Sequence, residues 1–281
     1  TRYESSAASD VYKRQMLQSA NMSLSLLPLL TKGVIHALSL YGSDEQKAQF
    51  LTKLTTGKWS GTMNLTEPQA GSDLSTIKTK ATPYGDHYLI SGQKIYITWG
   101  EHSETENIIH LVLARLPDAP EGTQGISMFL VPKYLVNSDG SLGDKNDVKV
   151  GGIEKKLGIH GSPTCTMIYG DNGGAIGYLV GPENKGLMCM FSMMNNARLS
   201  VGHQGIALGE RAYQQAVAFA EQRLQGQSKF VKGRSAIIHH PDVKRMIHLM
   251  RALSVGGSAL SFYTIAAEDR SKHANTDDRY L

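Results

Sequence analysis

The sequence predicts an α+β protein with a helical segment, a central antiparallel β-barrel or sandwich, and a C-terminal helical bundle. Two changes of hydrophobic period support this order. Apolar residues recur at helical spacing over 16–58, short apolar or alternating runs follow over 59–187, and helical spacing returns over 188–281. The central runs do not alternate with helices, which argues against a parallel dinucleotide-type sheet. We therefore expect three folded segments, with the fold incomplete at both ends.

Composition places the chain among ordinary globular proteins. It has 281 residues, of which 41% are hydrophobic and 19% charged, with a net charge of +4. No block of Lys or Arg is dense enough to argue for nucleic acid. Cys165 and Cys189 predict buried thiols rather than a disulfide framework, and no metal-ligand spacing is present. No secretory signal is visible, and Pro28 and Lys32 make the apolar stretch 24–41 a poor membrane span, so we expect a cytoplasmic protein.

The first part of the chain changes character after residue 15. The opening letters TRYESSAASDVYKRQ have no sustained apolar period, so we interpret residues 1–15 as a non-native leader. Residues 16–40 have helical spacing, with a kink or break at the proline. Ser43 and Gln46 fit a capping box, and Gly57 is a plausible stop for the helix that this box begins.

The central segment predicts short strands separated by turns. The expected strands are 77–81, 87–90, 94–99, 108–116, 126–131, 165–169 and 176–180. Turns are expected at 83–86 and 91–92, a hairpin at 171–174, and a surface insertion at 137–149.

The C-terminal segment predicts two long helices. The first covers 186–225, a loop covers 226–239, and the second helix continues to about residue 273. Pro241 suits the first position of that helix, and Asp242 suits its first turn. Two long antiparallel helices do not make a stable bundle, so we expect the C-terminal domain to continue past the last residue.

Two stretches organise the central segment. The first, MNLTEPQAGSD at 63–73, fits a strand end that breaks into a tight loop, because Pro68 removes a backbone donor and 71–73 can turn. Small residues and free N–H groups at such a bend admit a flat, acceptor-rich ring or a phosphate. The second stretch is GQKIYIT at 92–98. From the residues alone, the pair predicts a polar ligand loop between strands.

Together, TEPQAGSD and GQKIYIT closely resemble the flavin-binding signature of the acyl-CoA dehydrogenase family. YGSDEQK at 41–47, KLGIHGSPT at 156–164, NNAR at 195–198 and EQR at 221–223 extend the resemblance over most of the chain. The stretches GEHSETENIIHLVLARLPDAPEGTQGIS and HHPDVKRM are most similar to the larger branch of the family, which includes methylthiopropionyl-CoA dehydrogenases.

The resemblance implies FAD as the cofactor and an acyl-CoA thioester as the substrate. The implied reaction removes a proton at Cα and transfers a hydride from Cβ to flavin N5. Electron-transfer flavoprotein as the acceptor and a homodimer or homotetramer are also implied. The residues that the resemblance assigns to the flavin are Met63, Leu65, Thr66, Gly71, Ser72, Tyr96, Ile97, Thr98 and Arg223. Those assigned to the substrate are Ser72, Asn195 and Arg198.

The catalytic base is not among these residues. In most of the family it is a Glu in a late loop, which we expect beyond Leu281; in a minority it precedes the substrate arginine, where Ala197 stands here. We therefore expect the chain alone to have negligible dehydrogenase activity. Glu67 is expected to hold its turn rather than to move a proton. Four histidines are expected at the surface or at caps: His160, His203, His239 and His240.

Two alternative functions remain open. An acyl-CoA oxidase of the same superfamily would differ in its reoxidation by oxygen, so a comparison of electron acceptors separates it. A non-catalytic flavin- and nucleic-acid-binding relative would carry a basic C-terminal domain, and steeply salt-dependent binding to duplex DNA would reveal it. The corresponding basic residues form a modest cluster: Lys229, Lys232, Arg234, Lys244, Arg245 and Arg251.

Overall fold

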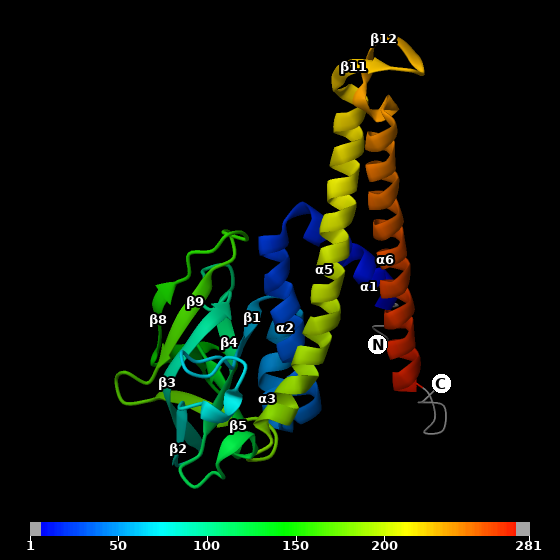
Figure 1. Cartoon of the computed structure of the whole chain (residues 1–281). Helices are drawn as coiled ribbons and strands as arrows, with labels where there is room; N and C mark the ends of the chain where they lie inside the picture. Colours follow the sequence, from blue (N-terminus) through cyan, green and yellow to red (C-terminus); the bar gives the residue numbers. More distant parts are fainter. Residues whose placement is uncertain (1–6, 274–281) are drawn as a thin grey trace. The chain divides into compact units, whose positions relative to one another are not determined.

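The computed structural model describes residues 7–273 and confirms a mixed α+β fold (Figure 1). The chain forms two compact units: Ser23–Ala197, and the described parts of Thr1–Met22 with Arg198–Leu281. The segments expected at 16–58, 59–187 and 188–281 follow the period of the pattern rather than compactness, and that division stays a prediction. We call Ser23–Ala197 the β unit and the other the helical unit.

Four helical pieces open the β unit: α2 (Met22–Tyr41), α3 (Asp44–Gln46), the π-helical η1 (Lys47–Leu51) and α4 (Thr52–Thr55). The capping box is confirmed, since Gln46 N donates to Ser43 Oγ at 3.2 Å and Ser43 N to Gln46 Oε1 at 3.1 Å. Gly57 follows the last helical turn with φ of +73°, as expected of a stop. Pro28 lies inside α2, so the break between helices falls at Asn21 instead.

Eight strands form the main sheet of the β unit. They are β1 (Trp59–Asn64), β2 (Lys80–Tyr84), β3 (His87–Thr98), β4 (Asn107–Arg115), β5 (Ile126–Pro132), β8 (Val148–Ile153), β9 (Thr164–Tyr169) and β10 (Ala175–Leu179). The order is β1-β4-β5-β10-β3-β9-β8, and β2 pairs with both β3 and β4. The strands β2, β3, β10, β5 and β4 therefore close into a ring, which favours the barrel over the sandwich. Most pairings are antiparallel, whereas β1 and β2 each run parallel to β4.

Two local expectations in this unit were wrong, and a third segment holds strands that were not expected. Ser91–Gly92 is no turn, because β3 continues through it with Gly92 at φ of +153°. The 171–174 turn does not make a hairpin: β9 and β10 each pair with a different part of β3. The 137–149 insertion contains β7 (Leu142–Lys145), which pairs with β6 (Tyr134–Val136), and the first residues of β8. The pairings of β9 and β10 with β3 involve distant partners that a local pattern cannot identify.

Two apolar clusters fill the β unit. The first joins α2, β1 and the start of α5, and includes Val34, Leu38, Trp59 and Met193. The second is built around Phe129 and includes residues of β2, β3, β4, β9 and β10. By length and composition α2 could cross a membrane, a test that the core helix of a folded domain also passes. Seven of its residues are buried, in agreement with the poor membrane span expected from the sequence.

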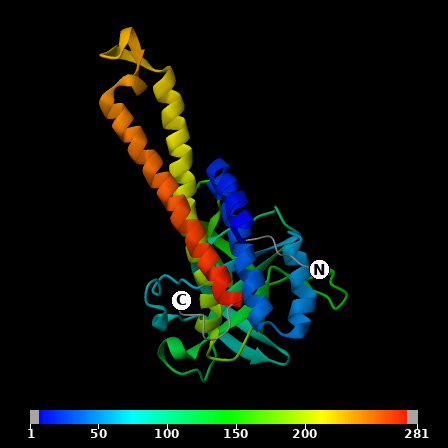
Figure 2. The same cartoon turned by 90° about the vertical axis from the view of Figure 1, so that its right-hand side faces the viewer.

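The helical unit consists of α1 (Ala7–Ala20), the later part of α5 (Gly186–Gln222) and α6 (Pro241–His273) (Figure 2). The expected loop 226–239 is largely a hairpin of β11 (Leu224–Ser228) and β12 (Val231–Ala236), followed by η4 (Ile237–His239). α5 therefore ends three residues before the expected position. The described residues 7–15 of the expected leader are helical, while residues 1–6 lie outside the described part. Whether the leader is native stays a prediction.

Candidate functional site

The first stretch forms the tight loop that the sequence predicts. β1 ends at Asn64, and Glu67 and Ala70 then exchange two backbone hydrogen bonds of 3.0 Å each. Asp73 closes the loop, because its carboxylate accepts from Ser75 N at 2.9 Å and caps the short helix η2 (Leu74–Thr76). The loop is therefore held by its own backbone, and its tip is exposed.

The second stretch is a bulged end of β3. Its register against β9 shifts between Lys94 and Ile97, and Tyr96 has φ of +61°. Trp99, just past the strand, has φ of +54°. Non-glycine residues in this left-handed region cost on the order of 1–3 kcal/mol each, so they persist only where the surroundings hold them. Such strain often lies at ligand sites.

The structure brings the two stretches together. Ile95 N donates to Thr66 O at 2.9 Å, so the bulge of β3 hydrogen-bonds directly to the loop. Gly92 lies against the segment that follows the loop, because a Cβ at this position would come within 2.6 Å of Thr79 Oγ1. The sequence predicted one polar loop between strands, and the structure shows two segments joined into one surface.

The expected flavin residues divide by the direction of their side chains. Leu65 and Ile97 are 7% and 2% exposed, so only their backbone atoms could reach a ligand. Tyr96 is 60% exposed. The others expected in this unit are exposed or half-buried: Met63, Thr66, Gly71, Ser72 and Thr98. None of the hydroxyls of the two threonines and the serine hydrogen-bonds within the described residues.

The remaining expected residues lie on or just after α5. Asn195 belongs to the β unit and is exposed, while Arg198 and Arg223 are exposed residues of the helical unit. Arg223 follows the last turn of α5, where its N–H donates to Phe219 O at 2.9 Å and its carbonyl accepts from Ile237 N at 2.9 Å. Its backbone is thus fixed between helix and hairpin, and its side chain extends outward.

A buried polar chain lies directly under the loop. Tyr169 OH donates to Asn64 Oδ1 at 2.9 Å, Asn64 Nδ2 donates to Thr62 Oγ1 at 2.8 Å, and Thr62 Oγ1 lies 2.7 Å from His110 Nδ1. When the threonine hydroxyl donates to Nδ1, the ring proton is on Nε2. Burial first, and then the charges of Lys133 and His102, lower the pKa of His110 to about 3. The imidazole is therefore neutral and structural.

The other histidines and the cysteines carry no sign of a metal centre. Cys165 and Cys189 are free and buried, as expected. Within the described residues, no group of three His, Cys, Asp or Glu side chains could hold a metal ion. His160 is exposed as expected, whereas His203 is buried, with Nδ1 3.0 Å from Ser261 Oγ. The surface expectation for His203 was wrong because the packing of helix against helix was not visible in the pattern.

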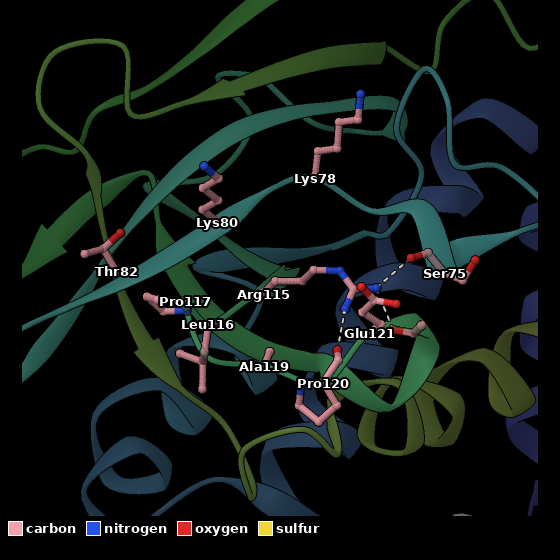
Figure 3. A pocket seen from close by; sticks show the side chains of 11 residues that line it. Ser75, Lys78, Lys80, Thr82, Arg115, Leu116, Pro117, Ala119, Pro120 and Glu121 are labelled. Carbon is pink, nitrogen blue, oxygen red and sulfur yellow. Dashed lines mark hydrogen bonds between the residues drawn. The ribbon is translucent and has the colours of Figure 1, made fainter.

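A separate hollow of about 910 Å³ lies beside β2 and the loop after β4 (Figure 3). Lys78, Lys80 and Thr82 project along one side of it, and none of the residues expected to bind flavin lines it. The guanidinium of Arg115 points into the loop after β4, where it donates to the carbonyl of Pro120 at 3.0 Å. It also donates to the carbonyl of Ser75 at 2.6 Å, among others. Arg115 therefore holds the loop after β4 in place, a role that was not expected from the sequence.

Comparison with known proteins identifies the family. Residues 62–172 match the family model "Acyl-CoA dehydrogenase, middle domain". The chain is 53% identical over 268 residues to 3-methylmercaptopropionyl-CoA dehydrogenase of Ruegeria pomeroyi, covering 94% of this chain and 45% of that protein. The chain belongs to the acyl-CoA dehydrogenase family. The predicted family is therefore confirmed, and this relative carries the name of the predicted branch.

Further relatives agree with this assignment. A butyryl-CoA dehydrogenase of Syntrophomonas wolfei is 40% identical over 273 residues, covering 94% of this chain and 45% of that protein. The solved butyryl-CoA dehydrogenase of Megasphaera elsdenii superposes with a TM-score of 0.76 at 23% identity, covering 92% of this chain and 63% of that one. The chain thus spans less than half the length of these two curated relatives, and the solved structure supports the fold.

Proposed function

We propose that this chain carries the FAD-binding part of an acyl-CoA dehydrogenase, an oxidoreductase that dehydrogenates an acyl-CoA thioester across Cα and Cβ. The observation that carries the proposal is the junction of the two family stretches, where Ile95 N donates to Thr66 O at 2.9 Å. The two joined stretches carry one exposed aromatic ring, Tyr96, and three hydroxyls without hydrogen-bond partners within the described residues. A flat ring rich in hydrogen-bonding atoms fits such a surface.

The residues of this surface fit FAD by their chemistry. Thr66 and Thr98 can hydrogen-bond the polar edges of the ring, and Tyr96 can cover part of its face. Gly71 offers backbone at the loop tip, where a Cβ would meet no atom within 4 Å, and Ser72 adds a hydroxyl for a phosphate or the thioester arm. The cofactor, when bound, accepts the hydride that leaves Cβ. The residues named here bind and orient it and keep water from that face.

Proton removal needs a base, which neither Ala197 nor Glu67 supplies. Ala197 has no titratable group, and Glu67 is committed to a buried ion pair. We therefore propose that the chain binds FAD but turns over acyl-CoA negligibly by itself.

Further parts of the proposal concern the substrate and partners. Asn195 and Arg198 are proposed to contact the CoA moiety, and Arg223 the flavin diphosphate of a neighbouring subunit, because a planar guanidinium suits two phosphate oxygens. This places the complete site in a homodimer or homotetramer. Electron-transfer flavoprotein is the proposed acceptor, and the cytoplasm the proposed location. The name of the Ruegeria relative suggests a sulfur-containing short acyl chain.

The test is FAD binding by the purified chain, followed by flavin fluorescence. We expect a saturable complex that Thr66→Val and Thr98→Val each weaken, by roughly tenfold if one hydrogen bond of about 1.4 kcal/mol is lost. Thr82→Val is the matched control, since Thr82 is an exposed strand threonine beside the separate hollow. Absence of FAD binding, or equal losses in all three variants, would refute the proposal. Comparing oxygen with electron-transfer flavoprotein as acceptor in a catalytically competent form distinguishes an oxidase.

A further inference from the structure

A buried ion pair joins the two stretches beneath their surface. Lys94 Nζ lies 2.8 Å from Glu67 Oε1, and the two side chains are 0% and 3% exposed. The same ammonium donates to Leu65 O at 3.1 Å. Glu67 belongs to the loop after β1 and Lys94 to β3, so the ion pair adds a buried side-chain contact to the backbone hydrogen bond that Ile95 N makes with Thr66 O. From the sequence, Glu67 was expected to hold its turn, and no role was expected for Lys94.

The carboxylate of Glu67 is fully used. It accepts from Thr79 Oγ1 at 2.6 Å, from Lys78 N at 2.7 Å and from Gln69 Nε2 at 2.6 Å, besides Lys94. Burial raises the pKa of Glu67, but the charge of Lys94 and these hydrogen bonds outweigh it and lower the pKa overall. Burial lowers the pKa of Lys94 to about 8, against the opposing charge of Glu67. Both groups are therefore charged at neutral pH.

The strained bulge begins directly after Lys94. At its far end, Trp99 N donates to Pro163 O at 2.7 Å, and Trp99 Nε1 donates to Ser23 O at 3.0 Å. At its near end, the buried ammonium of Lys94 is the side-chain anchor. The bulge that exposes Tyr96 is thus held at both ends, and the ion pair is its buried side-chain link to the loop.

We propose that Glu67 and Lys94 are a positioning pair, which keeps the loop 64–73 and the bulge 95–98 at the separation that the flavin requires. The inference rests on the proposed FAD function. A buried ion pair is weak support for stability, since replacing both partners by uncharged groups is often neutral, whereas it can specify one arrangement of the groups around it. Loss of the pair should therefore damage flavin binding more than folding.

The test uses the double variant Glu67→Gln with Lys94→Met, which leaves no buried charge unpaired. We expect at least a tenfold rise in the Kd for FAD, a shifted flavin reduction potential and an altered flavin absorption spectrum, with a Tm close to that of the unmodified chain. The single variant Lys94→Met leaves the carboxylate of Glu67 buried without its ion-pair partner, so it should lower Tm as well.

The matched control is Asn146→Ala. Asn146 is 5% exposed and joins neighbouring strands of the same unit, with its Nδ2 donating to Pro132 O and to Ile176 O at 2.9 Å each. Its loss should lower Tm and leave the potential and spectrum of bound FAD unchanged. The positioning role is overturned while the FAD function stands if the double variant binds FAD as the unmodified chain does. It is also overturned if Asn146→Ala changes the potential and spectrum of bound FAD as much as the double variant does. If the unmodified chain does not bind FAD, both fall.

Discussion

The buried His110 predicts that the β unit loses stability in mild acid. Its side chain is fully buried, and its pKa falls from 6.5 to about 3 in the folded chain. Protonation would place a charge in the core and would break the acceptor role of Nδ1 toward Thr62. Within the described residues, Nε2 has no hydrogen-bond partner that could compensate.

The sign and size follow from linkage. A depressed pKa means that the unfolded chain binds the proton more tightly, so stability is complete above pH 6.5 and falls as the pH drops toward 3. Between pH 7 and pH 5 the loss from His110 alone is roughly 2 kcal/mol, from 1.5 pH units at 1.36 kcal/mol each. Glu67 does not contribute in this window, because its pKa is lowered from 4.5.

The assay is urea unfolding at pH 7, 6 and 5, followed by tryptophan fluorescence. Both tryptophans of the chain, Trp59 and Trp99, are buried in the β unit, so the signal reports this unit specifically. His110→Asn keeps a polar atom near Thr62 and cannot be protonated. It should lower the free energy of unfolding at pH 7. It should also reduce the loss of that free energy between pH 7 and pH 5 by roughly 2 kcal/mol.

His102→Asn is the control, because His102 is only partly buried and its pKa is lowered mainly by that burial. This variant should keep the larger part of the loss in unfolding free energy between pH 7 and pH 5. If His110→Asn unfolds with the same pH dependence as the unmodified chain, the reasoning about the buried neutral imidazole is wrong.

Three substitutions test other features. Gly71→Val should change the free energy of unfolding in urea by no more than about 0.5 kcal/mol, since Gly71 is exposed and uncrowded, but it should weaken FAD binding. Gly152→Val, the control, should leave FAD binding unchanged. Equal effects of the two variants on FAD binding would contradict a ligand at the loop. Tyr96→Gly should relieve left-handed strain and raise stability by about 1 kcal/mol while FAD affinity falls; a clear loss of stability would count against strain. Ser43→Ala should cost about 1 kcal/mol of stability through the lost cap, with exposed Ser39→Ala near neutral, and equal costs would remove the capping argument.

Local features of the chain were largely predictable. The capping box at Ser43, the first-turn Asp242 and the turn that Asp73 closes depend on residues within a few positions of each other. The two flavin-like stretches also indicated the family from their amino-acid sequence alone. Long apolar runs such as β4 and β5 were recognisable because both strands are buried. Every residue of β5 is buried, and so is every residue of β4 except the last.

Pairing between distant segments was decided only by the tertiary structure. The hairpin expected at 171–174 failed because β3 is long enough to pair with both flanking strands. The contact of Lys94 with Glu67 and the left-handed Tyr96 were likewise invisible, since no local period encodes them. The sequence by itself determined the family, the order of helical and β segments and the residues of the loop. The fold alone decided which of those residues face outward and what holds them, because burial and strain depend on neighbours that are far away along the chain.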